Sequence, residues 1–427
     1  THYLTRDNQI RVLDDDFKRR ILAANDRMTK DALRVLGMAY RIVPVLPDEI
    51  ECETLERELI FAGMVGMIDP PRKEVAPAIA IAQEAGIRTI MITGDYPNTA
   101  RAIAESIHLL QPNHQVFTGV QLDNLSDQQL AQEVKRTDVF ARVSPEHKMR
   151  IVDALQANGD VVAMTGDGVN DAPAIKKADI GVAMGITGTD VAKETADMVL
   201  TDDNYASIVS AIEQGRIIYS NIRKFVYYLL SCNLAEIATI FLATIFGWRS
   251  PLAAIQLLWL NLVTDGAPAL ALATEKGDPD IMRQKPRPPK ESIINRRMQI
   301  GMVVQTIAIT AVTLYAFYLG SYTDPQHFEF AETMAFTTLS ISELFRALTA
   351  RSEYYPLYKI GFFKNKFMNI AIVSSLILIL LVVYVPFLQE IFNTKPLGWM
   401  QWIEIIPLIL VPSIAAELTK FFMSVKN

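Results

Sequence analysis

The stretch Ala-Met-Thr-Gly-Asp-Gly-Val-Asn-Asp-Ala-Pro, residues 163–173, decides the fold. Two valines precede it, which predicts a short buried strand that ends in a glycine-rich turn. Open α/β sheets place their chemistry at the carboxyl ends of strands, and here that end presents Asp167 and Asp171. Two carboxylates beside the amide of Asn170 suit Mg²⁺ next to a phosphate group. Taken alone, Gly-Asp-Gly is equally typical of an ordinary turn.

Strand and helix patterns alternate along the chain before this stretch. The expected strands are 59–67, 89–92, 139–143 and 161–164, and the expected helices are 74–85, 97–107 and 145–157. Such alternation predicts a parallel sheet covered by helices, which is the α/β class. The N-terminal region adds an expected strand at 2–5, and residues 14–42 predict a helix followed by a strand at 32–40.

Composition excludes several classes of function. The 427 residues have a net charge of -6 at pH 7, so there is no basic face and nucleic acid is not expected as a partner. The two cysteines, Cys52 and Cys232, lie far apart in unlike surroundings, which argues against a disulfide framework or a metal knuckle. No secretory signal is visible at the polar start of the chain. The chain also lacks an initiating Met and opens on strand-like residues, so we expect it to be a fragment cut through a folded region.

Six apolar stretches follow residue 203, each near the ~20 residues that cross a bilayer as a helix. They are 223–247, 252–274, 299–320, 331–350, 367–388 and 399–423. Lys and Arg crowd the connectors after the second and fourth stretches, whereas the connector after the third has none. By the positive-inside rule, we expect the basic connectors, the α/β part and the C-terminus to lie in the cytoplasm.

Polar and acidic residues recur at helical spacing inside three of these spans. They are Asn233 and Glu236 in the first, Asn261, Thr264 and Asp265 in the second, and Glu343 in the fourth. An ionised carboxylate at bilayer depth costs at least ~2.5 kcal/mol, so three of them facing lipid independently is not expected. If the three carboxylates instead converge on one shared cation, that cost is removed. Carboxylate, amide and hydroxyl oxygens are ligands of a hard ion such as Ca²⁺, and no His or Cys ligand set indicates a soft one.

Some of these acids have a second interpretation. Glu343 has Arg346 one turn later, which is an alternative salt-bridge partner. Three other acids lie near span ends or have no polar companions at helical spacing, and we do not expect them to be ligands: Glu332, Glu404 and Glu417. After Asp265, a Gly and a Pro should loosen the helix and free backbone carbonyls. A phosphate-binding α/β domain joined to cation-binding helices indicates a transport ATPase.

The chain resembles the C-terminal half of a P-type ATPase, most closely the Ca²⁺-transporting subgroup that includes the sarco/endoplasmic reticulum pumps. The matching stretches run in family order at 69–72 (DPPR), 91–95 (MITGD), 140–148 (FARVSPEHK), 165–173 (TGDGVNDAP) and 256–266 (QLLWLNLVTDG). The resemblance implies a remnant of a nucleotide-binding domain at 1–63 and a haloacid-dehalogenase-like, Rossmann-type phosphorylation domain at 64–204. It also implies a transmembrane domain of six helices at 205–427.

The resemblance implies catalytic roles as well. Asp167 would hold the catalytic Mg²⁺, with Asn170 and Asp171 supporting it. At a second strand end, Thr93 and Gly94 would contact the transferred phosphoryl group. These roles agree with phosphoryl transfer, in which positioning and charge stabilisation do most of the catalysis.

Other matched positions are implied to bind substrate and cargo. Lys148 would neutralise the charge of the phosphoryl group, Arg34 would contact ATP, and Asp95 and Arg142 would lie near its ribose. The implied Ca²⁺ ligands are the six polar residues of the spans: Asn233, Glu236, Asn261, Thr264, Asp265 and Glu343. Two ions per cycle are consistent with acids at both 236 and 343.

Departures from the family pattern are equally informative. The phosphorylated aspartate of the family lies in a DKTGT stretch, and no Asp-Lys pair occurs in this sequence. The TGE loop and the first four membrane helices are also missing, so this chain alone is not expected to form a phosphoenzyme. Two alternatives stay open, namely a P-type pump for another cation such as Mn²⁺ or Na⁺, and a non-catalytic split partner. The Asn-x-x-Glu and Asn-x-x-Thr-Asp patterns favour Ca²⁺. If the protein is bacterial, the membrane would be the plasma membrane.

Overall fold

The computed structural model describes residues 1–30, 33–43, 56–68, 70–323 and 328–424. It divides into two compact units, which we describe separately. The first comprises Thr1–Ala211 with Met282–Lys285, and the second comprises Ile212–Ile281 with the chain from Pro286 onward. Every strand of the described residues belongs to the first unit, whereas the second is helical.

The N-terminal region forms a small mixed sheet. Its strands are β1 (His2–Leu4), β2 (Ile10–Val12), β3 (Arg34–Tyr40) and β4 (Ile60–Met67), in the order β2-β1-β4-β3. The helix α1 (Asp15–Lys30) precedes β3 and packs against it. The predicted helix and strand of residues 14–42 are therefore present. Strand β4 pairs with β3 from Ile60 to Met67, so it continues past residue 63, the predicted end of the first domain.

The rest of the first unit alternates strands and helices, as predicted. The strands are β5 (Met91–Thr93), β6 (Gln115–Thr118), β7 (Thr137–Ala141), β8 (Ala163–Gly166), β9 (Ile180–Met184) and β10 (Met198–Leu200). The helices are α3 (Val75–Glu84), α4 (Pro97–Ser106), α5 (Gly119–Asp123), α6 (Asp127–Glu133), α7 (Pro145–Ala157), α8 (Ala172–Lys177) and α9 (Asp190–Thr195). All the pairings among β5 to β10 are parallel, which confirms the α/β prediction.

These six strands form two hydrogen-bonded groups instead of one continuous sheet, with the orders β5-β7-β6 and β10-β9-β8. Apolar packing joins the groups. Ile92 of β5 packs against the cluster that contains Phe140 of β7 and also against the cluster that contains Met164 of β8. The chemistry-bearing strands β5 and β8 therefore share a core, although the described hydrogen bonds do not pair them.

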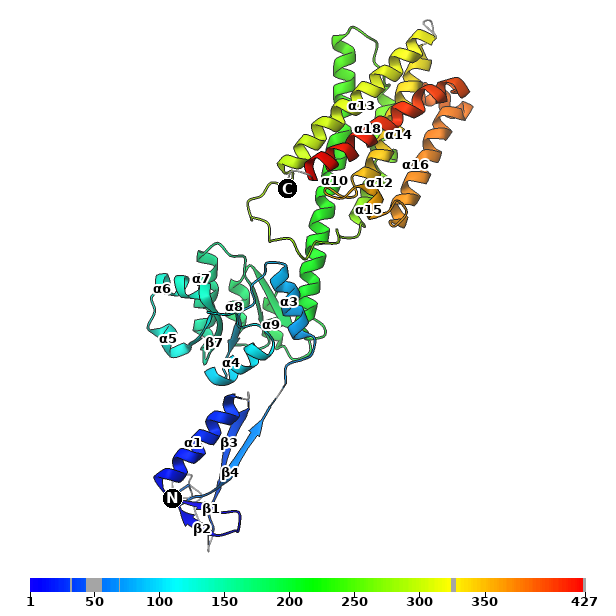
Figure 1. Cartoon of the computed structure of the whole chain (residues 1–427). Coiled ribbons are helices and arrows are strands. Elements are labelled where there is room, and N and C mark those ends of the chain that lie inside the picture. The colour runs from blue at the N-terminus through cyan, green and yellow to red at the C-terminus, as the bar shows by residue number, and fades with distance from the viewer. Residues whose placement is uncertain (31–32, 44–55, 69, 324–327, 425–427) are drawn as a thin grey trace. The chain divides into compact units, whose positions relative to one another are not determined.

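The second unit is a bundle of long helices. They are α10 (Tyr205–Ile245), α11 (Ala254–Trp259), a π-helical turn (Leu260–Thr264), α12 (Gly266–Ala273), α13 (Arg296–Thr323), α14 (Phe328–Thr349), α15 (Leu357–Ile360), α16 (Lys366–Tyr384), α17 (Pro386–Phe392) and α18 (Trp399–Ser424). Helices α13, α14 and α18 pack against one another, and α16 packs against α14 (Figure 1).

Five helices of the described chain are long and apolar enough to cross a membrane, so the predicted count of six is not confirmed. They are Tyr205–Ile245, Ala254–Ala273, Arg296–Tyr322, Lys366–Tyr384 and Trp399–Met423. The remaining predicted span, 331–350, falls in α14. This helix is buried over most of its length and includes many hydroxyl side chains as well as Glu343 and Arg346. Most of its polar side chains are buried, so they lie against neighbouring helices.

Candidate functional site

Asp171 organises the turn that follows β8. Its buried carboxylate accepts hydrogen bonds from the backbone N–H of Asp167 at 3.3 Å and of Gly168 at 3.1 Å through Oδ2. The other oxygen, Oδ1, accepts a hydrogen bond from the ammonium group of Lys148. Asp171 therefore has its charge compensated inside the protein. The carboxylate of Asp167 is exposed at the end of the strand and Asn170 is exposed in the same turn.

Gly166 permits this arrangement. A Cβ atom added to Gly166 would lie 2.4 Å from the Cβ of Asp171, a distance at which one of the two residues must move. A Cβ added to Gly168, two residues later, would have its nearest neighbour at 3.5 Å, which is ordinary contact. The close approach of the Asp171 side chain therefore requires a glycine at position 166 but not at position 168.

Local capping places Lys148 in the first turn of α7. Ser144 caps the helix by accepting the N–H of His147 at 3.4 Å, and its own N–H donates to Nδ1 of His147 at 3.1 Å. The other ring nitrogen of His147 lies 2.7 Å from Oδ1 of Asp123. This chain of contacts fixes the start of α7 and hence the direction in which Lys148 leaves it.

The end of β5 presents the second predicted cluster. The hydroxyl of Thr93 donates to Oδ2 of Asp95 at 3.0 Å, and the N–H of Asp95 donates back to that hydroxyl at 3.1 Å. The N–H of Arg142 donates to the carbonyl of Asp95 at 3.2 Å, which ties the ends of β5 and β7 together. The guanidinium of Arg142 lies 3.8 Å from the ring centroid of Tyr96.

The predicted soluble site residues are only partly joined by contacts. Within the described part of the chain, no hydrogen bond or ion pair links the Thr93 cluster to Asp167 or Lys148. Gly94 is exposed beside Thr93. Arg34 is exposed on β3, in the separate four-stranded sheet. The nucleotide-binding roles implied for Arg34 and Arg142 stay predictions.

A loop that the sequence interpretation missed adjoins this turn. The N–H of Thr189 donates to the carbonyl of Asp167 at 2.8 Å. Asp203 holds the same loop by accepting the N–H groups of Gly185, Ile186 and Thr187 at 2.6–3.0 Å. These backbone hydrogen bonds, led by that from Ile186, lower the pKa of Asp203 to about 2. In the sequence, Asp203 is an acid that follows a short strand, and nothing in that pattern distinguishes a residue that holds a loop from an ordinary exposed acid.

The polar residues of the helical unit converge. The side-chain amide of Asn261 donates to Oε2 of Glu236 at 2.8 Å, which links the π-helical turn to α10. Tyr228, also on α10, donates from its hydroxyl to Oδ1 of Asp265 at 3.0 Å. Ligand atoms of Cys232, Asp265 and Glu343 all lie within 4.8 Å of one another. The cluster thus unites α10, the residue after the π-helical turn and α14.

Several carboxylate oxygens of these acids have no hydrogen-bond partner within the part of the chain that the structure describes. They are Oε1 of Glu236, Oδ2 of Asp265 and both oxygens of Glu343. Asp265 is 1% exposed and Glu343 is fully buried. An unpaired buried carboxylate is costly, and a bound cation is one way in which proteins compensate it. The donor set, oxygen-rich and buried, fits a hard divalent cation.

The remaining predicted ligands lie beside the cluster. Asn233 is partly buried on α10, one turn before Glu236. The hydroxyl of Thr264 donates within its own segment to the carbonyl of Leu260 at 3.0 Å, and the carbonyl of Thr264 accepts the hydroxyl of Ser375 at 3.2 Å. The structure therefore joins Asn261 to Glu236 and, in a second set of contacts, brings Asp265 close to Glu343, while the hydroxyl of Thr264 has an internal partner.

The helix irregularity occurs one turn earlier than predicted. The π-helical turn spans Leu260–Thr264, and the N–H of Asp265 donates five residues back to the carbonyl of Leu260 at 2.9 Å. Regular helix resumes at Gly266. Pro268 lies in the first turn of α12 and has no N–H to donate, and the carbonyl of Thr264, four residues earlier, accepts the hydroxyl of Ser375 at 3.2 Å.

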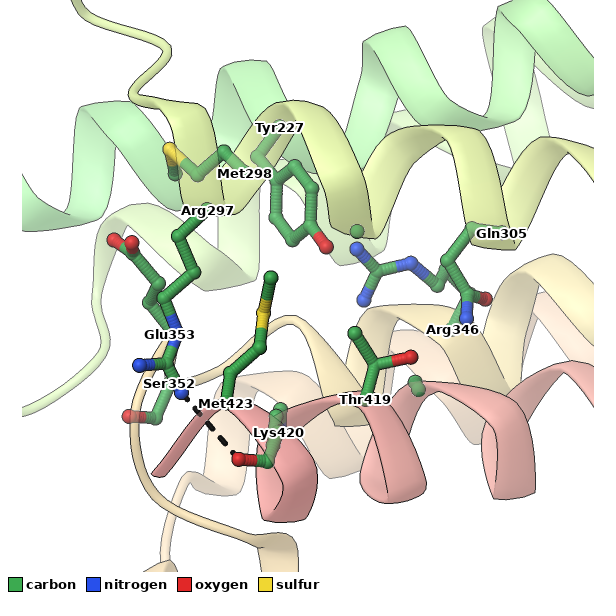
Figure 2. Close-up of a pocket in the computed structure, with 12 residues that line it drawn as sticks. Tyr227, Arg297, Met298, Gln305, Arg346, Ser352, Glu353, Thr419, Lys420 and Met423 are labelled. Atoms are coloured by element: carbon green, nitrogen blue, oxygen red, sulfur yellow. Dashed lines mark hydrogen bonds between the residues drawn. The ribbon is translucent and has the colours of Figure 1, made fainter. Parts of the chain in front are cut away.

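The alternative salt bridge between Glu343 and Arg346 is not formed. Arg346 is buried, donates to the hydroxyl of Thr349 at 3.1 Å and places its guanidinium 4.5 Å from the ring centroid of Tyr227. Its Nε and Nη2 atoms have no hydrogen-bond partner among the residues that the structure describes. Figure 2 shows Arg346 in a small pocket that Gln305 and Lys420 also line.

The three acids that were not expected to be ligands lie elsewhere. Glu332 accepts the side-chain amide of Asn393 at 2.7 Å, and Glu417 pairs with Lys420 at 2.8 Å. Glu404 is exposed on α18. None of the three belongs to the described cluster of Cys232, Asp265 and Glu343.

Comparison with known proteins gives matches in both units. A family model described as cation transporting ATPase, C-terminus, matches residues 249–422. Two models described as haloacid dehalogenase-like hydrolase match residues 3–179 and 149–212. Similar curated proteins include a calcium-transporting ATPase 1 of Bacillus cereus, 44% identical over 98% of this chain, and a calcium-transporting ATPase of Bacillus subtilis, 44% identical over 95%.

A eukaryotic relative is also similar, namely a calcium-transporting ATPase 1 of Saccharomyces cerevisiae, 40% identical over 100% of this chain. The chain covers 48%, 46% and 45% of the lengths of these three relatives, so it spans about half of each. With the long apolar helices, the matches identify an integral membrane protein.

Proposed function

Because the chain belongs to the P-type cation-transporting ATPases, we propose that it forms the C-terminal part of an ATP-driven pump that exports Ca²⁺ from the cytoplasm. It would supply the Mg²⁺ and phosphate pocket and most of the Ca²⁺ ligands. One observation supports this proposal above all: Glu236, Asp265 and Glu343 are buried in the helical unit and have carboxylate oxygens with no hydrogen-bond partner among the described residues.

The cation site is proposed to use oxygen donors from three segments. Glu236 of α10, Asp265 after the π-helical turn and Glu343 of α14 would contribute carboxylates, while Asn261 is already oriented by its hydrogen bond to Glu236. Asn233 and Thr264 would complete the set after small rotations. The relaxed helix before Asp265 supports this role, because irregular backbone at membrane depth occurs where it lines a polar site.

The phosphate pocket is proposed at the end of β8. Asp171 is engaged by Lys148 and by two backbone N–H groups, so the exposed Asp167 is the carboxylate left to hold Mg²⁺, with Asn170 beside it. Mg²⁺ bound there would neutralise charge on the phosphoryl group. Lys148 would add a fixed positive charge from α7. The Thr93 hydroxyl and the Gly94 backbone would contact the phosphoryl oxygens.

The remaining parts of the cycle must come from outside these residues. No Asp-Lys pair occurs in the 427 residues, so the aspartate that accepts the phosphoryl group would be supplied by another segment. ATP would be held partly by Arg34, Asp95 and Arg142. We place the first unit and the C-terminus in the cytoplasm, from the Lys and Arg residues in the connectors after Ala273 and after Thr349.

The experiment that tests this proposal measures phosphoenzyme formation from ATP by the pump that contains this chain, in the presence of Ca²⁺ and Mg²⁺. Wild-type protein should incorporate phosphate in a Ca²⁺-dependent manner, and Asp167→Asn should abolish incorporation. Asp160→Asn, an exposed acid just before β8, is the matched control and should behave as wild type. Incorporation that persists in Asp167→Asn, or that ignores Ca²⁺, would refute the proposal.

A further inference from the structure

Cys232 is a feature of the cation cluster that the sequence did not indicate. It lies on α10, four residues before Glu236 and therefore on the same helix face. Its side chain is fully buried and its thiol is free. The sulfur and one oxygen each of Asp265 and Glu343 all lie within 4.8 Å of one another.

The neighbours of the thiol are open for coordination. Oδ2 of Asp265 and both carboxylate oxygens of Glu343 are buried, and no described residue donates a hydrogen bond to them. A buried cysteine usually packs as a small apolar residue, and its surroundings are then apolar as well. Cys232 does pack in a cluster with Ala269 and Leu272, but its sulfur also lies within 4.8 Å of carboxylate oxygens of Asp265 and Glu343. An apolar packing role does not account for this polar side of its environment, which suits a metal ligand.

The spacing suits a single ion. Metal–ligand bonds of about 2.3 Å to thiolate sulfur and about 2.3–2.6 Å to oxygen allow two ligands of one ion to lie up to about 5 Å apart. All three atoms of the cluster are within that limit of each other. Thiolate selects softer metals, whereas carboxylate and amide oxygens alone select hard ones.

We propose that Cys232 is a further ligand of this site and that it extends the site to thiophilic divalent cations such as Cd²⁺. This inference rests on the proposed cation site and adds a class of cation to it. On binding, the S–H bond of Cys232 breaks, its proton leaves to water, and both electrons stay on sulfur as the sulfur–metal bond forms. Asp265 and Glu343 provide the other two bonds.

The test uses the full chain in lipid nanodiscs, with Cys52→Ser so that Cys232 is its only thiol. Cd²⁺ is titrated while the ultraviolet absorption of sulfur-to-cadmium charge transfer is recorded. The band should saturate, excess Ca²⁺ should remove it, and Cys232→Ser should abolish it while lowering Cd²⁺ affinity relative to Ca²⁺ affinity at least tenfold. A band that persists in Cys232→Ser, or Cd²⁺ binding without a band, would overturn the proposal.

A second variant keeps the thiol, so it tests the proposal even if Cys232→Ser fails to fold. Asp265→Asn should weaken the Cd²⁺ band at least tenfold, because the same ion needs this carboxylate; an unchanged titration would place the cadmium elsewhere and overturn the proposal. The two inferences separate cleanly. Loss of Ca²⁺ binding with an intact Cd²⁺ band would refute the calcium proposal alone, and Ca²⁺ binding without a thiol-dependent band would refute only the role of Cys232.

Discussion

The hydroxyl of Tyr228 donates a hydrogen bond to Oδ1 of Asp265 across 3.0 Å, and both side chains are buried. This contact fixes one oxygen of the carboxylate and leaves the other, Oδ2, buried without a hydrogen-bond partner among the described residues. Removing a hydrogen bond to a charged group costs about 1.5–3 kcal/mol. Tyr228→Phe should therefore weaken Ca²⁺ binding roughly tenfold or more.

Equilibrium binding of radioactive Ca²⁺ to the chain in nanodiscs measures this effect. The matched control is Tyr227→Phe, because Tyr227 is the adjacent residue of α10 but stacks with Arg346 in the pocket of Figure 2. Equal affinities for the two variants would show that Tyr228 does not position Asp265.

The glycines of the phosphate turn predict contrasting effects. Gly166→Ala should displace Asp171 from Lys148, because the new Cβ would approach the Asp171 side chain to 2.4 Å. Overpacking of this kind costs about 1–3 kcal/mol. Gly168→Ala meets its nearest atom at 3.5 Å and should fold as wild type. Thermal unfolding of the first unit, followed by hydrogen exchange at β8, compares the stabilities of the two variants. A loss of stability in Gly168→Ala as large as that in Gly166→Ala would contradict the geometry.

The pKa of Asp203, lowered from 3.8 to about 2, predicts a pH dependence. A lowered pKa in the folded state means that the ionised carboxylate stabilises the fold above about pH 4 and that this contribution disappears as pH falls through about 2. The stability difference between wild type and Asp203→Asn should therefore be constant above pH 4 and shrink between pH 4 and pH 2. Urea unfolding, followed by hydrogen exchange in β9 and β10, measures it. A difference that grows on acidification would have the wrong sign.

Arg346 predicts an electrostatic effect on the cation site. It is a buried cation that no carboxylate of the described residues pairs with, one helical turn from Glu343. A positive charge at this distance opposes the binding of another, so Arg346→Met should raise Ca²⁺ affinity roughly threefold to tenfold. Arg346→Lys retains the charge and should not. Ca²⁺-binding isotherms recorded in nanodiscs measure the effect. A lower Ca²⁺ affinity in Arg346→Met than in wild type would contradict it and would mean that the guanidinium supports the site by packing.

Much of the fold was predictable from local signals. The helix expected at 145–157 is α7 with the same bounds, because Ser144 and Pro145 start it and Gly159, at a φ of +87°, follows its end. Short strands were less predictable. β6, β9 and β10 have only three to five residues, and their pairing depends on contacts distant in sequence.

The cation cluster was predictable only in part. Helical spacing indicated that Asn233 and Glu236 share a face, and that Asn261 and Asp265 share another. It could not show which faces meet, because that depends on packing between α10, α14 and the π-helical turn. Tyr228 and Cys232 resemble ordinary core residues in the sequence, so their contacts with Asp265 appear only in three dimensions.

The central claim, that buried carboxylates of the helical unit bind Ca²⁺, is tested most directly by equilibrium binding of radioactive Ca²⁺ to the purified chain in nanodiscs. Wild-type chain should bind Ca²⁺ saturably, and Asp265→Asn should lose that binding. Glu332→Gln, which alters a half-buried acid of α14 outside the cluster, should retain it. Wild-type binding that survives unchanged in Asp265→Asn would contradict the account.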